Sequence, residues 1–232
     1  MVRRRVSVLL PCRAGSSRVA GKNTRPFGPR GESLLEIKLK QVIELSFVHE
    51  VILSTNDPVC VDIGQRVAGD LLTVDHRPEH LCLDTTSLSD LTRHFGAIAS
   101  GEYFLWTHVT SPFFGQTAYK RGYEAFLRAI NKGHDSLLAV EPMQDFLIFR
   151  DKPMNFGQPE NYWPRTQDLE SFHRVTSGLF IGGTADLLAH GARAGNRPLF
   201  FEVTGPEALD IDWPQQFQMA QMIASSGQYL DE

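Results

Sequence analysis

Short apolar runs alternate with helix-like patterns through the first two-thirds of this 232-residue chain, and this alternation constrains its fold more than any other feature. Each run has the length of a buried strand, and each segment between two runs is long enough to cross back over a sheet. The expected strands are 6–10, 51–55, 71–74, 103–109 and 136–140, and the expected helices are 34–45, 58–68, 87–98 and 118–131. Strands separated by helices predict an α/β fold with a mainly parallel sheet.

The pattern changes at residue 141. The stretch 141–175 is rich in Pro, Asn, Gln and aromatic residues, and it places Tyr162 and Trp163 next to Pro164-Arg165. We interpret it as an irregular arm whose aromatic side chains suit a subunit contact, and a long surface loop is the alternative. Strand-like patterning resumes at 178–183 and 199–203, and a last helix is expected at 214–225. The sequence thus predicts one core, 1–140 with 176–232, and an inserted dimerisation arm, 141–175.

Composition excludes several classes of function. A formal net charge of -4 argues against a general nucleic-acid binder, so any basic cluster should be a local site. No apolar run approaches the ~20 residues that span a bilayer, and the run after Arg5 stops at Pro11, too early for a secretion signal. The three cysteines lie far apart, without metal-ligand or disulfide spacing. We expect a cytoplasmic protein with neither nucleic-acid nor membrane partners.

The first strand leads into a Gly/Ser-rich loop within the segment 10–23, and this loop carries three cations, Arg13, Arg18 and Lys22. Backbone N–H groups and several cations in one small volume suit a polyphosphate. The spacing is neither that of a P-loop nor that of a dinucleotide-binding fold. An ordinary strand–turn with solvated charges is the alternative.

Other polar groups follow later strands, and the carboxyl ends of parallel strands share one edge of a sheet. They are Asn56-Asp57, Arg77 and Thr110-Ser111. Arg77 suits a phosphate or a base edge, or else a surface salt bridge. The run from Asp84 to Ser87 caps the next helix or supplies hydroxyls to a nucleotide. His108 is either a donor to a ligand or a core histidine.

Near the C-terminus, Asp210-Ile-Asp212 places two carboxylates on one side of an extended segment. Mg²⁺ prefers one or two carboxylates together with substrate phosphates and waters. A solvated loop end is the alternative, but a metal pair would complement the basic loop in a phosphoryl-type transfer.

Taken in order, these segments resemble the acylneuraminate cytidylyltransferases, the CMP-sialic acid or CMP-nonulosonate synthetase family. The resemblance extends from Leu10 to the last helix. It rests on Arg13-Ala-Gly-Ser16 with Gly21-Lys-Asn23, Leu53-Ser-Thr55, Arg77-Pro-Glu79 with Asp84-Thr85, Thr110-Ser-Pro112, Pro164-Arg165 and Asp210-Ile-Asp212. Asn23 after Lys22 looks more like the nonulosonate enzymes than the Kdo branch, which usually has Pro there.

This resemblance implies a three-layer nucleotidyltransferase fold of the GT-A-like, Rossmann-like kind. It also implies a homodimer whose arm reaches the partner's site, and a reaction of CTP with a 2-keto-3-deoxy sugar acid that gives CMP-sugar and pyrophosphate. Asp210 and Asp212 would carry Mg²⁺ (or Mn²⁺), and Arg13, Lys22 and Asp212 would be catalytic. The implied nucleotide-binding residues are Arg13, Ser16, Lys22, Asn23, Arg77, Asp84, Thr85 and Ser87. The implied sugar-binding residues are His108, Thr110, Ser111, Arg150 and Arg165.

Three departures from the family pattern lie on the sugar side. His108 replaces the usual glutamine, Phe149-Arg150 stands near an expected lysine, and the segment 176–181 lacks the usual Asn-Gly and tyrosine. Three hypotheses therefore stay open: a CTP-dependent sugar-acid enzyme, a related enzyme with another nucleotide or a Kdo-type acid, and a non-catalytic nucleotide-binding subunit.

Overall fold

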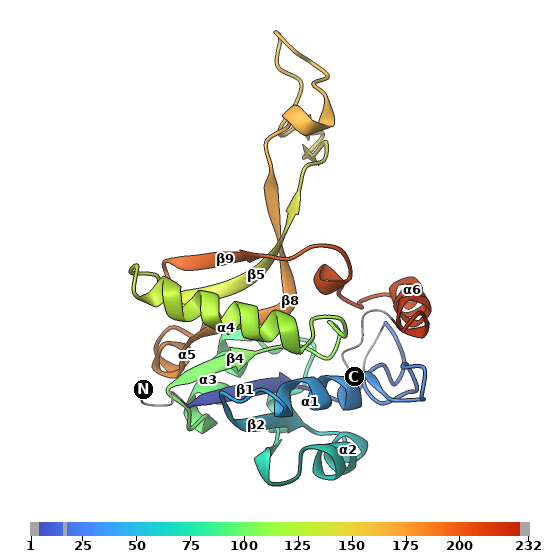
Figure 1. Ribbon diagram of the computed structural model, residues 1–232, viewed down its shortest axis with the longest axis vertical. Coiled ribbons are helices and arrows are strands. Elements are labelled where there is room, and N and C mark those ends of the chain that lie inside the picture. Colours follow the sequence, from blue (N-terminus) through green and yellow to red (C-terminus); the bar gives the residue numbers. More distant parts are fainter. Residues whose placement is uncertain (1–4, 16–17, 228–232) are drawn as a thin grey trace.

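The computed structural model describes residues 5–15 and 18–227 as a seven-stranded sheet with helices on both faces (Figure 1). The strands of the sheet are β1 (Val6–Pro11), β2 (Val48–Thr55), β3 (Leu72–His76), β4 (Tyr103–Trp106), β5 (Ser136–Met143), β8 (Phe172–Gly183) and β9 (Pro198–Glu202). The α-helices are α1 (Leu34–Ile43), α2 (Pro58–Ala68), α3 (Leu88–Ile98), α4 (Gln116–Ile130), α5 (Thr184–His190) and α6 (Pro214–Ser225). Short 3₁₀ turns cover Gly69–Leu71, Glu79–Leu81, Thr166–Asp168 and Gly205–Ala208. The predicted α/β class and mainly parallel sheet are confirmed.

The strand order is β3-β2-β1-β4-β8-β5-β9. All neighbouring pairs are parallel except those of β8, which runs antiparallel to β4 and β5. From β1 the chain first builds outward through β2 and β3, and it then returns to the other side of β1 with β4. Ligands of open α/β sheets bind outside the carboxyl ends of the strands at such a reversal. The loops after β1 and β4 meet at this point.

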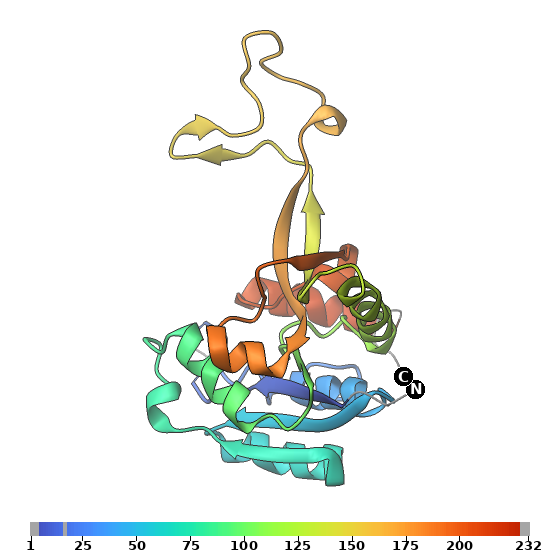
Figure 2. The same cartoon turned by 90° about the vertical axis from the view of Figure 1, so that its left-hand side faces the viewer.

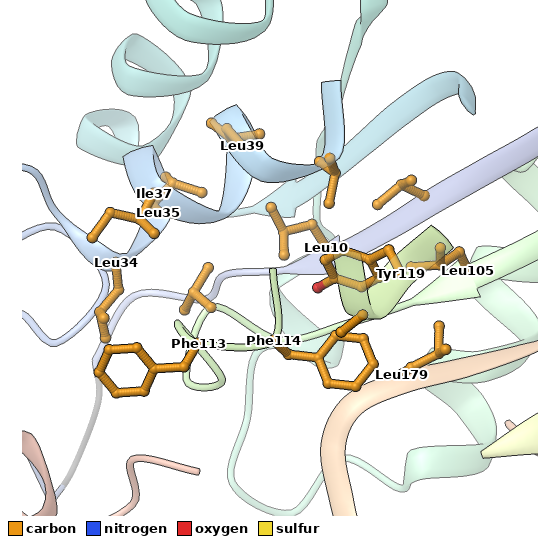
Figure 3. Close-up of a cluster of buried hydrophobic side chains, with 14 of the residues drawn as sticks. Leu10, Leu34, Leu35, Ile37, Leu39, Leu105, Phe113, Phe114, Tyr119 and Leu179 are labelled. Atoms are coloured by element: carbon orange, nitrogen blue, oxygen red, sulfur yellow. The ribbon is translucent and has the colours of Figure 1, made fainter. Parts of the chain in front are cut away.

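Successive side chains of a strand point to opposite faces of the sheet, and each face has its own hydrophobic core. In β1, Val8 and Leu10 join the larger core, which α1, α2, α4 and α6 cover, whereas Leu9 joins the smaller core under α3 and α5. Figure 3 shows part of the larger core, where Leu10 and Leu179 pack near the rings of Phe114 and Tyr119. Helices therefore cover both faces of the sheet, which explains why its central strands are mostly apolar runs.

Local signals explain why several helices begin where they do. Ser33 and Glu36 form a capping box at the start of α1: the Glu36 N–H donates to Ser33 Oγ at 3.2 Å, and the Ser33 N–H donates to the Glu36 carboxylate at 2.8 Å. Asp57 caps α2, whose first residue is Pro58. The bounds of α2 and α6 agree with the sequence prediction.

Several bounds differ from the expected elements, and three of the differences are informative. The helix α5 was not predicted, because its seven residues are too few to establish a period, and it ends at Gly191 in the left-handed region (φ 62°). The strand expected to reach Val109 ends at Trp106, because a turn follows in which the Ser111 N–H donates to the His108 carbonyl at 3.3 Å. The helix expected over 34–45 ends at Ile43.

The segment expected to be irregular is ordered at its base. There β5 and β8 continue as a two-stranded ribbon, in which Met143 lies opposite Phe172. The ribbon carries a small tip away from the sheet, and a hairpin projects sideways from the tip (Figures 1 and 2). The hairpin joins β6 (Ile148–Phe149) to β7 (Lys152–Pro153) through two residues of positive φ, as a twisted two-residue turn requires.

The tip has its own aromatic cluster. Phe156 is buried there, stacked on Trp163 with ring centroids 4.8 Å apart and edge-on to Phe146 at 5.2 Å. Trp163 and Tyr162 nevertheless stay 66% and 55% exposed, and Ile148 is 68% exposed. Such a concentration of exposed apolar surface on a projecting element is typical of interaction surfaces.

None of the helices within residues 5–15 and 18–227 has both the length and the apolar character needed to cross a bilayer.

One contact between the sheet and the loop after β4 is testable through Gly178. A Cβ at Gly178 would lie 2.4 Å from Cδ2 of the fully buried Phe114 ring. We expect Gly178→Ala to lower the free energy of unfolding by about 1–3 kcal/mol through overpacking, measured by urea denaturation. Phe114→Leu provides the control: in the double variant the loss should be smaller than the sum of the single losses. Additive losses would show that the two residues do not clash.

Candidate active site

The peptide unit of Ile211 joins three segments that are distant in the sequence. Its N–H donates to the Thr110 carbonyl at 2.9 Å, and its carbonyl accepts from Lys22 Nζ at 2.7 Å. The Ile211 side chain is fully buried. The basic loop after β1, the loop after β4 and the Asp-Ile-Asp segment are therefore fixed against one another.

Two carboxylates flank this peptide unit. One oxygen of Asp210 accepts from Ser177 Oγ at 2.6 Å, and its other oxygen, Oδ1, is buried without a hydrogen-bond partner in residues 5–15 and 18–227. Asp212 forms an ion pair with Arg18 at 3.1 Å. Burial lowers the pKa of Lys22, although the charges of Asp212 and Asp210 act in the opposite direction. Both predicted carboxylates thus lie beside Lys22.

This arrangement fits a divalent cation that takes part of its shell from a substrate. No group of three or more His, Cys, Asp or Glu side chains suited to a metal occurs in the described part of the chain. Asp210 and Asp212 supply two carboxylates instead, and the unpartnered Oδ1 of Asp210 is an acceptor that lacks a donor. Mg²⁺ is often bound by only one or two carboxylates together with phosphates and waters. These two side chains are the candidate metal ligands.

The basic loop is anchored to its neighbours on both sides. The Arg13 guanidinium donates to the Cys82 carbonyl at 2.8 Å and forms an ion pair with Asp84. The Ala14 N–H donates to Asn56 Oδ1 at 2.8 Å, and Asn23 Nδ2 donates to the Arg13 carbonyl at 3.5 Å. These contacts bring together four predicted nucleotide-site residues, Arg13, Lys22, Asn23 and Asp84. The predicted Ser16 lies outside the described residues.

Three small pockets surround these side chains. One of 180 Å³ contacts Arg13, Arg18, Lys22, Asn23, His108 and Thr110. A second of 330 Å³ lies on the other side of Arg13 and His108, and its lining includes Arg77, Asp84, Ser87 and Trp106. A third of 210 Å³ lies over the loop itself, between Gly15, Lys22 and Asp57. A larger cavity of 670 Å³ lies between α1 and α6, but its lining contains none of the predicted site residues. We place the site at the small pockets, because the charges gather there.

Arg77 is a buried framework residue at the wall of the second pocket. It is 5% exposed, and its guanidinium donates to Ser54 Oγ at 2.9 Å and to the Ser54 carbonyl at 2.8 Å. Ser54 Oγ donates in turn to Asp75 at 2.6 Å, and the same carboxylate oxygen contacts His94 at 2.8 Å. Burial lowers the pKa of Arg77. The alternative of a surface salt bridge is therefore wrong, because this side chain faces the end of β2 rather than solvent.

His108 stands between the first two pockets, two residues beyond β4. Trp106 Nε1–H donates to His108 Nε2 at 2.9 Å, and Arg193 Nη1 lies 3.2 Å from the same nitrogen. Burial, together with the charges of Arg193, Lys22, Arg77 and Lys38, lowers the pKa of His108 to about 3. The ring is therefore neutral at physiological pH.

Of the remaining predicted residues, Ser111, Thr85, Arg150 and Arg165 do not line the three small pockets, whereas Ser87 lines the second. Ser111 is 1% exposed, and its hydroxyl has no hydrogen-bond partner in residues 5–15 and 18–227. Ser87 caps α3 by accepting from the Asp90 N–H at 3.1 Å, which confirms its capping role, and Thr85 lines a separate pocket beside it. Arg150 and Arg165 lie in the arm, where Arg150 occupies the hairpin turn and Arg165 pairs with Asp168 at 2.7 Å.

Sequence reasoning did not assign a role to three side chains that touch the centre. Arg18 was noticed only as one of the loop's cations, although it pairs with Asp212. Ser177, which contacts Asp210, and Arg193, which contacts His108, approach from β8 and from the segment before β9. Neither belongs to a motif, and only the antiparallel placement of β8 brings Ser177 to the carboxylate.

Comparison with known proteins identifies the family of this chain. The family model described as cytidylyltransferase matches residues 7–141, which include the basic loop, Arg77 and the loop after β4. The chain is 23% identical over 236 residues to the CMP-N,N'-diacetyllegionaminic acid synthase of Legionella pneumophila (strain Philadelphia 1), with 97% of this chain and 98% of that protein covered.

Two solved structures share the fold. A CMP:2-keto-3-deoxy-manno-octonic acid synthetase complexed with CTP has a TM-score of 0.67 at 13% identity, covering 96% of this chain and 99% of the other. The 4-diphosphocytidyl-2C-methyl-D-erythritol synthase of Anaerococcus prevotii has a TM-score of 0.68 at 12% identity, covering 95% and 96%. The family match covers more than half of the chain, and the charged centre lies outside the carboxyl ends of the strands, where open α/β sheets bind their ligands. The chain therefore belongs to the cytidylyltransferase family and is a nucleotidyltransferase enzyme.

Proposed function

We propose that this enzyme transfers the cytidylyl group of CTP to a 2-keto-3-deoxy sugar acid, a nonulosonate such as a sialic, legionaminic or pseudaminic acid, and releases pyrophosphate. The observation that carries the proposal is the position of Lys22: it is held on the Ile211 carbonyl, between Asp210, Asp212 and the Arg13 loop. Cations for a triphosphate and carboxylates for a metal thus meet at one point. The legionaminic acid synthase, similar along nearly its whole length, supports the choice of acceptor class.

In this proposal, Arg13, Lys22 and Asn23 bind the triphosphate, and Arg77, Asp84, Thr85 and Ser87 belong to the nucleotide side. An acceptor hydroxyl oxygen bonds to the α-phosphorus while the bond from that phosphorus to the β-phosphate bridging oxygen breaks. The hydroxyl proton leaves to solvent, and pyrophosphate takes the electron pair. Cations already in place stabilise this leaving charge without reorganisation. Asp210 and Asp212 would hold Mg²⁺ (or Mn²⁺), which lowers the pKa of a coordinated hydroxyl and neutralises phosphate charge.

In the same proposal, the arm forms the contact between the two chains of a homodimer. Arg150 and Arg165 stand on a tip that projects away from the site of their own chain (Figures 1 and 2). The exposed aromatic surface of the tip suits contact with a second copy, which would bring these arginines to the partner's sugar side together with His108, Thr110 and Ser111. The core, 1–140 with 176–232, and the arm, 141–175, then have separate tasks. A cytoplasmic location accords with the free thiols of Cys12, Cys60 and Cys82.

The reaction itself is tested with the purified protein. Pyrophosphate release is measured with CTP, GTP, UTP and ATP against sialic, legionaminic, pseudaminic and Kdo-type acids, and products are identified by mass. We expect release with CTP and a nine-carbon acid. Activity with another nucleotide or with the eight-carbon acid would favour the related-enzyme alternative. CTP binding by calorimetry without turnover on any acid would indicate a non-catalytic subunit.

Asp212→Asn tests the carboxylate pair. We expect turnover to fall by about 10²-fold or more, because a group that stabilises developing charge is lost. The fold should persist, since Asp212 meets Gln216 of α6 through its backbone N–H, at 2.8 Å, and not through its carboxylate. Asp70→Asn, an exposed change in the turn after α2, is the matched control and should leave the rate unchanged. A near-normal rate for Asp212→Asn at saturating metal would contradict a metal role.

Arg165→Ala tests whether the arm crosses between protomers. We expect this variant and Asp212→Asn each to be nearly inactive. An equimolar mixture should recover up to about a quarter of the wild-type rate, because half of the dimers are mixed and one of their two sites is intact. Sedimentation velocity before and after mixing checks that protomers exchange. Exchange without recovery would place each arm in the site of its own chain.

A further inference from the structure

The hydrogen bonds around His108 determine which of its nitrogens carries the proton. Trp106 Nε1–H, at 2.9 Å from His108 Nε2, can only donate, and so can the Arg193 guanidinium at 3.2 Å. Two donors facing one nitrogen require that nitrogen to be unprotonated. In a neutral ring the hydrogen must then be on Nδ1, which has no partner within residues 5–15 and 18–227.

Arg193 is held beside His108 by aromatic rings and not by a carboxylate. Its guanidinium lies 4.2 Å from the ring centroid of Phe180 and 5.5 Å from that of Trp106. Residues 5–15 and 18–227 contain no carboxylate in ion-pair contact with it. The Arg193 side chain is partly buried, and its positive charge faces the histidine. Buried arginines are usually paired with a carboxylate, so this arrangement needs an explanation.

We propose that Arg193, together with Trp106, is a positioning residue that holds His108 as a neutral hydrogen-bond donor through Nδ1–H. The site then selects an acceptor substrate that presents an oxygen atom with a lone pair to this N–H group. Carboxylate, keto and hydroxyl oxygens of an acidic sugar satisfy this condition. An ammonium group or an apolar substituent does not. The inference rests on the proposed function, because His108 is placed there on the sugar side. Beyond the proposed function, it says that His108 donates a hydrogen bond to the sugar acid and that Arg193 determines this.

The position of His108 suits this role. His108 lines both the pocket beside Lys22 and Asn23 and the pocket beside Arg77 and Asp84. Nε2 is used by the protein, so Nδ1–H is the group left for a molecule in either pocket. A donor at this point has the polarity of an amide N–H, which is consistent with a histidine at a position where the family resemblance leads us to expect glutamine.

The surrounding charges keep that polarity constant with pH. The charged groups that lower the pKa of His108 are all cations from four different segments: Arg193, Lys22, Arg77 and Lys38. Each disfavours the protonated, positively charged ring, and burial acts in the same direction, whereas the two donors at Nε2 determine the tautomer of the neutral ring. Removing Arg193 would remove one of the two donors and the largest of these charge effects. Protonation would then place Nε2–H against the Trp106 N–H, two donors in conflict, and the ring would turn.

The first test follows the ring directly, in protein without substrate. Proteins with ¹⁵N-labelled histidine are compared by long-range NMR from pH 8 to pH 5: wild type, Arg193→Met and Arg128→Met. His108→Gln identifies the His108 signals by their loss. Arg128, on the exposed face of α4, is the matched control. We expect wild type and the control to show a neutral Nδ1–H ring throughout, and Arg193→Met to begin to gain a proton toward the acidic end of this range, because one cation and one donor are removed while burial, the larger cause, remains. A wild-type ring protonated on Nε2, or an unchanged ring in Arg193→Met, would overturn the proposal.

The second test separates positioning from general damage to the fold. For Arg193→Met we expect KM for the sugar acid to rise about tenfold at pH 5 and less at pH 8, with KM for CTP unchanged, because a pH-dependent defect on one substrate reports the histidine. His108→Gln should keep most of the affinity for the acid, since its amide also donates, and His108→Leu should lose it. Equal, pH-independent losses for both substrates would indicate a merely structural arginine and contradict the proposal. If wild type accepts no sugar acid at all, the proposed function fails, while the NMR result still decides the state of His108.

Discussion

The site depends on one buried peptide unit, the N–H and C=O of Ile211. Each group is satisfied by a different segment: the N–H by the Thr110 carbonyl and the C=O by Lys22 Nζ. A buried peptide group left without a partner costs about 1–3 kcal/mol, so these two bonds resist separation of the segments. The position of Asp210 and Asp212 relative to the basic loop is therefore a consequence of backbone hydrogen bonding, and substrate is not needed to create it.

Thr110 is itself held by a second buried group. Lys38 of α1 is fully buried, and its ammonium donates at 2.9 Å to the carbonyls of Ser111 and Phe114 and to the Tyr119 hydroxyl. Gln41, one turn later, donates to the Pro112 carbonyl at 2.7 Å. The loop after β4 thus has its carbonyls bound by the helix that follows the basic loop. Side chains of α1 thus fix the loop that contains Thr110, and Thr110 in turn fixes Ile211 between the two carboxylates.

Sequence reasoning found the parts of the site that are contiguous or that follow strands. The basic loop, Arg77 and Thr110 could be placed at one edge because alternating strands and helices imply a parallel sheet whose carboxyl ends align. It missed what depends on pairing between distant strands. The antiparallel entry of β8 leaves no local signature, so the role of Ser177 at Asp210 could not be predicted. Arg193 stands in a segment without periodicity, after a helix of only seven residues, and its meaning comes entirely from the rings it contacts.

The two sides of the centre are built differently, and this explains why the nucleotide was easier to infer than the acceptor. The candidate triphosphate side consists mainly of one loop of a dozen residues, in which cations and glycines remain recognisable as a pattern. The candidate acceptor side is assembled from single residues on separate elements: His108 after β4, Arg193 before β9, and in our proposal two arginines from a second chain. Such a surface can change one residue at a time without disturbing the core, because each side chain is supported by its own element. A change at any of these positions alters the shape or polarity offered to the sugar while Lys22, Ile211 and the carboxylates stay where they are. In our proposal, specificity for the acceptor is therefore separable from the transfer chemistry, and His108 with Arg193 is the place where this chain differs in the acceptor that it selects.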